Sequence, residues 1–238
     1  MLTWVEPNQP LPPPESARAD PNGLVAAGRD LSAKRLLEAY GQGIFPWYSQ
    51  GQPVLWWSPD PRMVVFVDEF QPSRSLRKIL RRLDQAGMWS VTLDHAFVDV
   101  MRACAAPRSG QDGTWITGDI IRAYQALHQA GHAHSVEVWS EGTLIGGLYG
   151  VSIGRMFFGE SMFAKVTYAS KCAYAALIGM LRRLDFSMVD CQQSTGHLAS
   201  LGAREITRSQ FLAHLQRLSA LSGPDWKNVS IDWSATLR

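Results

Sequence analysis

The clearest pattern of apolar and polar positions lies in residues 144–163, LIGGLYGVSIGRMFFGESMF. The apolar, β-forming run 144–151 predicts a strand, residues 152–154 predict a turn, and residues 155–163 predict the returning strand. Gly146 and Gly147 interrupt the first strand, which indicates a bulge or the close approach of another segment. The stretch therefore predicts a β-hairpin around which neighbouring elements can be placed.

The remaining pattern predicts strands and helices on both sides of this hairpin. A helix capped by Asp30 or Ser32 runs to about residue 40. Turn-forming residues and caps delimit the other elements. The predicted strands are 63–67, 89–93, 135–139 and 186–192, and the predicted helices are 72–83, 94–104, 117–128, 168–184 and 209–218.

The helix predicted at 72–83, PSRSLRKILRRL, separates charge from apolar surface. Its cations recur at helical spacing and share one face, whereas its leucine and isoleucine residues form the other. Such a stripe favours contact with a nucleic-acid phosphate backbone, because phosphates relieve the repulsion between the cations. A solvated basic face is the alternative. The five cations are Arg74, Arg77, Lys78, Arg81 and Arg82.

Three polar residues stand in or beside apolar strands. Glu160 lies among phenylalanine and methionine residues, either near water at a strand end or in an apolar slot. In the slot, desolvation would raise its pKa and make it a candidate acid–base or amine-binding group. Strand periodicity places Asp190 and Gln192 on one side, with Cys191 opposite. That pair could hold and polarise a substrate, or it could cap the helix that begins near Thr195.

Composition and charge exclude several classes of protein. The chain has 238 residues, 46% of them hydrophobic and 18% charged, which is typical of a folded globular protein. Its three cysteines form no CxxC pair, and its histidine spacing does not favour a metal site. We expect no signal peptide, no membrane span and a reducing cytoplasmic location. A net charge of +2 is too small to indicate nucleic-acid binding by itself.

Several short segments together form a recognisable series. As they stand in this sequence, they are PNGL (21–24), GIFPW (43–47), WWSPDPR (56–62), GTWI (113–116), HAHSVEVW (132–139), the hairpin 146–163, ASK (169–171), DCQ (190–192) and HLASLGA (197–203). In this order they resemble one family, the leucyl/phenylalanyl-tRNA–protein transferases. The matches extend from about residue 20 to 215, and one departure is Arg29, where the family usually has glycine.

The resemblance implies an α/β (α+β) fold in two parts. A small N-terminal domain, residues 1–62, would carry aromatic and proline-rich loops, and residues 63–238 would form a larger GNAT-like domain with a mixed sheet flanked by helices. It implies that Leu or Phe, and less readily Met, passes from aminoacyl-tRNA to the N-terminal Arg or Lys of a protein. This is the N-degron reaction, and it requires no cofactor and no metal. We expect a monomer.

The resemblance also implies roles for particular side chains. Asp190 and Gln192 would orient and deprotonate the attacking amine, and Glu160 would hold that amine or the acceptor's basic side chain. The five cations of the helix would lie along the tRNA acceptor stem. The tRNA 3′-adenosine would meet Trp47, Trp115 and Tyr40, and the donor's side chain would enter a pocket of Leu148, Met162, Leu177, Leu181 and Val189.

Two other functions compete with this hypothesis. A CoA-dependent N-acetyltransferase of the same fold needs a glycine-rich pyrophosphate loop, but residues 163–170, FAKVTYAS, contain no glycine. A non-catalytic tRNA-binding protein would use only the basic helix and the tryptophans. Substitution of Gln192 and Glu160 distinguishes this binding protein from a transferase. A pure binder would keep its tRNA binding and lose no activity, whereas a transferase would lose turnover while still binding tRNA.

Overall fold

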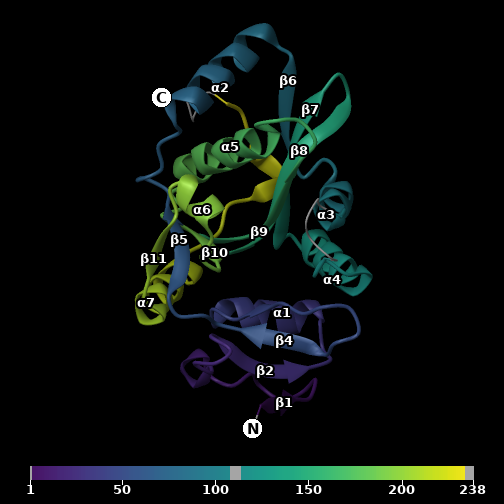
Figure 1. Ribbon diagram of the computed structural model, residues 1–238, viewed down its shortest axis with the longest axis vertical. Helices are drawn as coiled ribbons and strands as arrows, with labels where there is room; N and C mark the ends of the chain where they lie inside the picture. The colour runs from purple at the N-terminus through teal and green to yellow at the C-terminus, as the bar shows by residue number, and fades with distance from the viewer. Residues whose placement is uncertain (1, 108–113, 234–238) are drawn as a thin grey trace.

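The computed structural model describes residues 2–107 and 114–233, which form two sheets (Figure 1). The N-terminal sheet has the order β1-β2-β4-β3, in which only β1 and β2 run parallel. Helix α1, Ala33–Gly41, is capped by the Ser32 hydroxyl, while Asp30 accepts from the Ser32 amide. The strands of this sheet are β1 (Thr3–Val5), β2 (Leu24–Gly28), β3 (Phe45–Pro46) and β4 (Val54–Trp57), and η1 (Pro14–Ser16) precedes β2.

The second sheet is mixed and has the order β11-β5-β10-β9-β8-β7-β6. Its neighbours pair antiparallel except for β9 and β10, which run parallel. This confirms a small N-terminal unit followed by a larger mixed α/β unit, whereas the domain division at residue 62 stays a prediction. The strands are β5 (Arg62–Phe66), β6 (Trp89–Leu93), β7 (Ala133–Ser140), β8 (Thr143–Ile153), β9 (Met156–Ala164), β10 (Met188–Gln192) and β11 (Arg204–Ile206).

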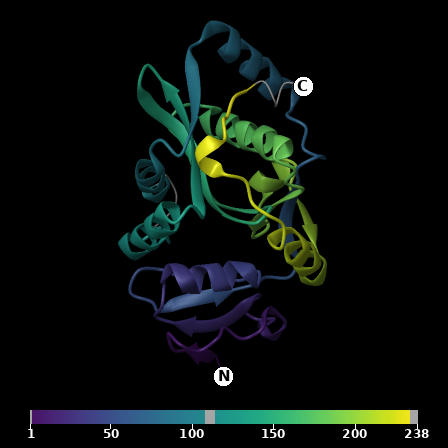
Figure 2. The same cartoon turned by 180° about the vertical axis from the view of Figure 1, so that it is seen from behind.

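Helices cover both faces of the larger sheet, and each face has its own apolar core. One core joins α2 and α5 to the sheet, and the other joins α1, α3, α4 and α7 to it. The C-terminal segment, yellow in Figure 2, runs from α7 along the larger domain and includes η2 (Trp226–Asn228). The helices are α2 (Arg74–Ala86), α3 (Phe97–Ala105), α4 (Gly118–Gln129), α5 (Ala169–Arg183), α6 (Gly196–Ser200) and α7 (Arg208–Ser219).

The predicted hairpin is confirmed as β8 and β9, with its turn at residues 154–155 rather than 152–154. Gly154 adopts a positive φ of 59°, which a glycine accommodates without strain. The close approach predicted at Gly146 is also present, because a Cβ there would lie 2.5 Å from the Cβ of Ala169. Glycine therefore lets the first turn of α5 pack directly on β8.

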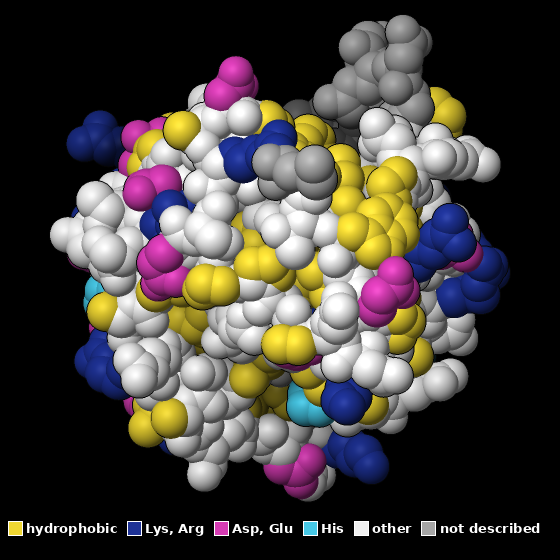
Figure 3. All heavy atoms as spheres, turned by 90° about the horizontal axis from the view of Figure 1, so that it is seen from below, with side chains coloured by type: hydrophobic (Ala, Val, Ile, Leu, Met, Phe, Trp, Pro, Cys, Tyr) yellow, Lys and Arg dark blue, Asp and Glu magenta, His cyan; other side chains and the backbone are white. Residues whose placement is uncertain are grey.

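The N-terminal unit contributes α1 to the core of the larger one, so the two share apolar contacts. Figure 3 shows the molecule from this end, where hydrophobic side chains gather in patches and Lys and Arg side chains stand mainly around the rim. Two exposed tryptophans belong to this unit, Trp4 at 44% and Trp47 at 41% exposure. Large exposed aromatic rings of this kind are available for contact with a partner.

Among the described residues, no helix is long and apolar enough to cross a membrane. Within the same part of the chain, no group of three or more His, Cys, Asp or Glu side chains is placed to hold a metal ion.

Candidate active site

Glu160 occupies a β-bulge in the hairpin. Tyr149 of β8 pairs with Ser161, and Gly150 pairs with Gly159, so Glu160 is the extra residue. A bulge redirects the side chain of its extra residue, and here that carboxylate is directed toward helices α1 and α4. A simple strand alternation could not predict this orientation.

Three side chains from distant parts of the chain hold the Glu160 carboxylate. The Tyr40 hydroxyl of α1 donates to Oε1 at 2.7 Å, and the Tyr124 hydroxyl of α4 donates to Oε2 at 3.2 Å. The side-chain amide of Gln192 donates to Oε1 at 3.0 Å. The two tyrosines are fully buried and their hydroxyls contact each other, whereas Glu160 and Gln192 remain partly exposed. Glu160 is therefore not sealed from solvent as a residue, although three hydrogen bonds surround its carboxylate.

The surroundings of the Glu160 carboxyl group raise its pKa toward neutral pH. Burial raises the pKa of Glu160 to about 7, and repulsion from Asp190 adds to this shift, while the hydrogen bonds from the tyrosines and Gln192 oppose it. Burial and the Glu160 charge raise the pKa values of Tyr40 and Tyr124 well above their usual range, so both remain neutral donors. A carboxyl group tuned in this way suits a general base.

A second bulge positions Gln192. Asp190 pairs with Val64 and Gln192 with Met63, so Cys191 is the extra residue, and Gln192 adopts a left-handed φ of 59°. The last parallel pair between β9 and β10 is Phe158 with Asp190. Glu160 and Gln192 therefore both lie just beyond the point where the two strands stop pairing.

Asp190 lies beneath this site in a buried ion pair. Its Oδ1 and Oδ2 accept from Nε and Nη2 of Arg62 at 2.8 and 2.7 Å, and both side chains are fully buried. Arg62 also donates from Nη1 to the Gly43 carbonyl at 3.0 Å and stacks on Phe45 and Phe211. The Asp190 carboxylate further accepts from the Gln192 backbone amide at 2.9 Å. Both oxygens of the Asp190 carboxylate therefore accept hydrogen bonds from the protein itself.

This geometry corrects the expected roles of two residues. Asp190 has no surface open to a substrate amine, because Arg62 and the strand backbone enclose it. Tyr40 has no exposed ring face on which an adenine could stack, because it is fully buried beneath Glu160. The alternative that Asp190 and Gln192 cap the next helix is also wrong, since Thr195 caps α6.

The other predicted positions fall into two groups. The donor-pocket residues belong to the core between α5 and the sheet. Met162 packs partly buried against this core, which contains the other four, Leu148, Leu177, Leu181 and Val189. Trp47 follows β3 and is 41% exposed, and Trp115 lies partly exposed just before α4. Both tryptophans thus retain accessible ring surface.

The basic helix is confirmed as α2, with the Ser73 hydroxyl as its cap. Leu76, Leu80 and Leu83 are buried against the body of the protein. Four of the five cations are exposed, and Arg77 is partly buried and donates to the Pro72 carbonyl. The five side chains line a surface groove of about 500 Å³, formed by Arg74, Arg77, Lys78, Arg81 and Arg82.

Two residues of the site, Tyr124 and Arg62, carry little or no signal of their role in the sequence. Tyr124 is one of several apolar positions on the predicted helix, and no local signal marks its hydroxyl as functional. Arg62 precedes an apolar strand and gives a weak signal, because an arginine at the edge of a buried strand needs a partner. In both cases the partner lies far away in the sequence, 36 residues from Tyr124 and 128 residues from Arg62.

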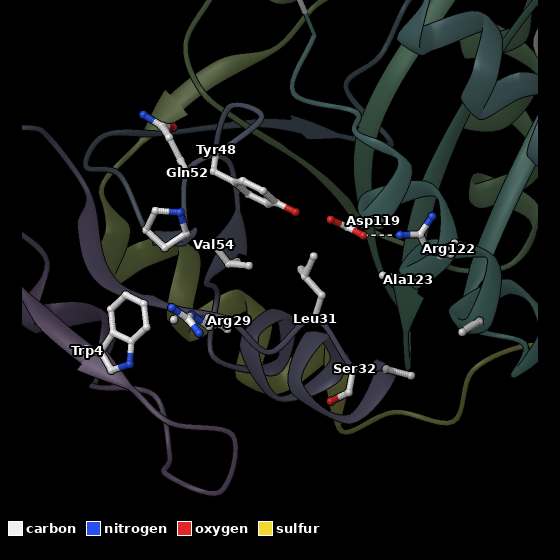
Figure 4. A pocket seen from close by; sticks show the side chains of 15 residues that line it. Trp4, Arg29, Leu31, Ser32, Tyr48, Gln52, Val54, Asp119, Arg122 and Ala123 are labelled. Atoms are coloured by element: carbon white, nitrogen blue, oxygen red, sulfur yellow. Dashed lines mark hydrogen bonds and ion pairs between the residues drawn. The ribbon is translucent and has the colours of Figure 1, made fainter.

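A larger cavity, of about 810 Å³, lies between the N-terminal unit and α4 (Figure 4). Trp4, Arg29 and Tyr48 line one side, and Asp119 and Arg122 line the other. None of the predicted site residues lines this cavity, so the cavity and the predicted chemistry are at different places.

Most of this chain is also similar in sequence to known proteins. The family model described as leucyl/phenylalanyl-tRNA protein transferase matches residues 64–216, and the model described as its N-terminal domain matches residues 29–60. The chain belongs to the leucyl/phenylalanyl-tRNA–protein transferase family. The transferase matches proteins of that name from Paraburkholderia phytofirmans, at 60% identity over 91% of this chain and 90% of the relative, and from Bordetella petrii, at 53% identity over 99% and 95%.

Solved structures also match the transferase, at lower similarity. FemX covers 72% of this chain and 66% of its own, with a TM-score of 0.48 and 10% identity. A GCN5-related N-acetyltransferase-like protein from Streptococcus suis covers 74% and 64%, with a TM-score of 0.33 and 16% identity.

Proposed function

We propose that the transferase moves Leu or Phe, and less readily Met, from an aminoacyl-tRNA to the N-terminal Arg or Lys of a protein. The product carries a new peptide bond and enters the N-degron pathway. The observation that carries the proposal is the carboxyl group of the partly exposed residue Glu160, with a pKa of about 7, held by Tyr40, Tyr124 and Gln192. One chain contains every residue that the proposal uses, so the transferase would act as a monomer.

In the proposed reaction, the acceptor's α-amine attacks the ester carbonyl carbon of the donor. Glu160 accepts the proton that the amine nitrogen loses. As the tetrahedral intermediate collapses, the bond between the carbonyl carbon and the 3′-oxygen of the tRNA ribose breaks, and that oxygen takes up the proton from Glu160. Glu160 thus replaces Asp190 as the proton acceptor. The exposed part of the Gln192 amide can orient the amine or the carbonyl, while its other hydrogen bond holds Glu160.

Asp190 would act through its neighbours rather than on substrate. Its carboxylate accepts from the Gln192 backbone amide, which maintains the left-handed turn of β10, and Arg62 neutralises it. Without Arg62, a second negative charge near Glu160 would raise the pKa of Glu160 further. The buried pair therefore positions Gln192 and limits the charge around the base.

The donor side chain would enter the core beneath α5 through Met162, which is the partly exposed member of the predicted pocket. We expect Met162→Ala to lower kcat/KM for Phe-tRNA and Leu-tRNA by about tenfold to a hundredfold, because the apolar contact that holds the donor is lost. Steady-state kinetics with each donor measure this. A defect that appears only in the KM of the acceptor peptide would contradict the pocket assignment.

The tRNA would bind through stacking and charge. Its 3′-adenosine would stack on Trp47 and Trp115, and its acceptor stem would lie along the basic face of α2. Such a surface would contact the phosphate backbone and would not distinguish long tRNA sequences. The donor would then be selected by its amino acid.

We expect substitution of Arg74, Lys78 and Arg81 by alanine to weaken tRNA binding and to reduce its log–log salt slope by about 2 to 3. These three cations are exposed on one face of α2, so their loss should leave the fold intact. Filter binding at several salt concentrations measures both quantities. Substitution of Arg18 and Lys34, exposed cations of the N-terminal unit, is the control and should change neither. An unchanged slope in the α2 variant would remove this helix from the RNA interface.

A direct transfer assay tests the proposed function. The transferase is incubated with labelled Leu-tRNA and a peptide that begins with Arg, and label is expected on the peptide. A peptide with an acetylated N-terminus is the negative control, because its nitrogen cannot attack. Label that stays on tRNA under all conditions would refute the function.

A further inference from the structure

A second groove, of about 430 Å³, opens beside the end of β9 and the first turn of α5. Met162 and Ala164 contribute apolar surface to it, and Ser170 adds a hydroxyl from α5. Lys165 and His197 are exposed and line the same groove. No acidic side chain lines it among the residues that the structure describes.

The charge of this groove indicates which of the two substrates, the acceptor protein or the donor tRNA, it would bind. An acceptor with N-terminal Arg or Lys brings positive charge, which Lys165 would repel. A single-stranded RNA segment brings a phosphodiester, which Lys165 can pair with and the His197 and Ser170 side chains can hydrogen-bond. The apolar walls suit a base or a ribose, as in other single-strand sites. The groove therefore fits RNA better than the acceptor.

The position of the groove supports the same assignment. Met162 lines the groove and also belongs to the predicted donor pocket, two residues beyond Glu160. Helix α2, with its basic face, packs in the same apolar core as α5. The groove therefore lies two residues from Glu160 along β9 and at the beginning of the helix that shares a core with α2.

We propose that this groove holds the phosphodiester of the single-stranded 3′ end of the donor tRNA, with Lys165, His197 and Ser170 as its ligands. This inference rests on the proposed function and adds a subsite to it. The subsite would carry the unpaired nucleotides between the acceptor stem on α2 and the terminal adenosine. Its contacts are to phosphate, so it would accept the common 3′ sequence of any donor tRNA.

Donors of increasing length test the subsite. The transferase is given phenylalanine esterified to adenosine, to the trinucleotide CCA, and to full-length tRNA, with one Arg-initiated peptide as acceptor. We expect Lys165→Met combined with His197→Ala to lower kcat/KM about tenfold or more for the trinucleotide and tRNA donors and to leave the adenosine donor unchanged. Lys165→Met retains the apolar stem, and Lys165→Arg should restore most of the loss. Lys34→Ala is the control with an exposed lysine elsewhere.

Each outcome separates the subsite from the underlying function. An equal loss with the adenosine donor would overturn the subsite, because the substitutions would then act on catalysis or folding. A defect confined to the KM of the peptide would place the acceptor in the groove instead. If the unmodified transferase uses none of the three donors, the proposed function fails. Normal use of all three donors by the variant overturns only the subsite.

Discussion

Replacement of Glu160 by glutamine is expected to lower kcat by about 10²- to 10⁴-fold, which is the range for loss of a general base. Glutamine retains the shape and can still accept from Tyr40 and Gln192, so the fold and the KM of the donor should change little. Single-turnover transfer from Phe-tRNA to an Arg-initiated peptide measures the loss. Glu205→Gln, an exposed carboxylate on β11, is the matched control and should retain full activity. Near-normal turnover of Glu160→Gln would exclude Glu160 as the proton acceptor.

The pH dependence of the transfer rate should reflect the titration of the Glu160 carboxyl group. Because the pKa of Glu160 is about 7, the ionised form that can accept a proton becomes dominant as pH rises through 7. The rate of the parent enzyme is therefore expected to rise with pH across this region. In Glu160→Gln, the part of the rise that belongs to this carboxyl group should disappear, leaving the titration of the acceptor amine.

The stability of the parent enzyme should depend on pH in the opposite sense to its activity. Folding raises the pKa of Glu160, so the folded state binds more protons than the unfolded state between about pH 4.5 and 7. The associated stability is present below this window and is lost as pH rises through it. Glutamine is neutral throughout. The melting temperature of Glu160→Gln relative to the parent should therefore increase from pH 5 to pH 8.

Arg62→Met is expected to destabilise the protein by about 3–5 kcal/mol, because it leaves the Asp190 carboxylate buried without its partner. Both side chains are fully buried, so water cannot take the place of the guanidinium. Chemical denaturation measures the free energy of unfolding. Arg102→Met, which removes a surface ion pair whose side chains are 69% and 64% exposed, should cost less than about 1 kcal/mol.

The double variant Arg62→Met, Asp190→Leu should recover much of this loss, because it removes both charges and retains apolar volume. Its activity should stay low even where it is folded, since the Gln192 backbone amide loses the carboxylate that holds it. Recovery of stability without activity would show that the pair positions Gln192. A double variant with normal kcat would contradict this positioning role, and a single Arg62→Met variant as stable as the parent would contradict the energetic account.

Much of the local structure could be predicted from the chain alone. The apolar, β-forming run at residues 144–151 and the turn residues that follow it predict the β8–β9 hairpin within two residues at each end. The spacing of Arg74 to Arg82 and of the intervening leucines predicts the two faces of α2. These features depend on contacts between near neighbours, which helical and strand periodicity describe directly.

The active site depends on information that periodicity does not contain. Two bulges, at Glu160 and at Cys191, break the two-residue repeat and change where Glu160 and Gln192 lie. The partners are distant in the chain, 120 residues from Glu160 to Tyr40 and 128 residues from Asp190 to Arg62. Only the packing of α1, α4, β5 and β10 brings them together. That packing fully buries Asp190 in an ion pair and leaves Glu160 partly exposed with a raised pKa, so the tertiary structure decides which carboxylate can act as a base.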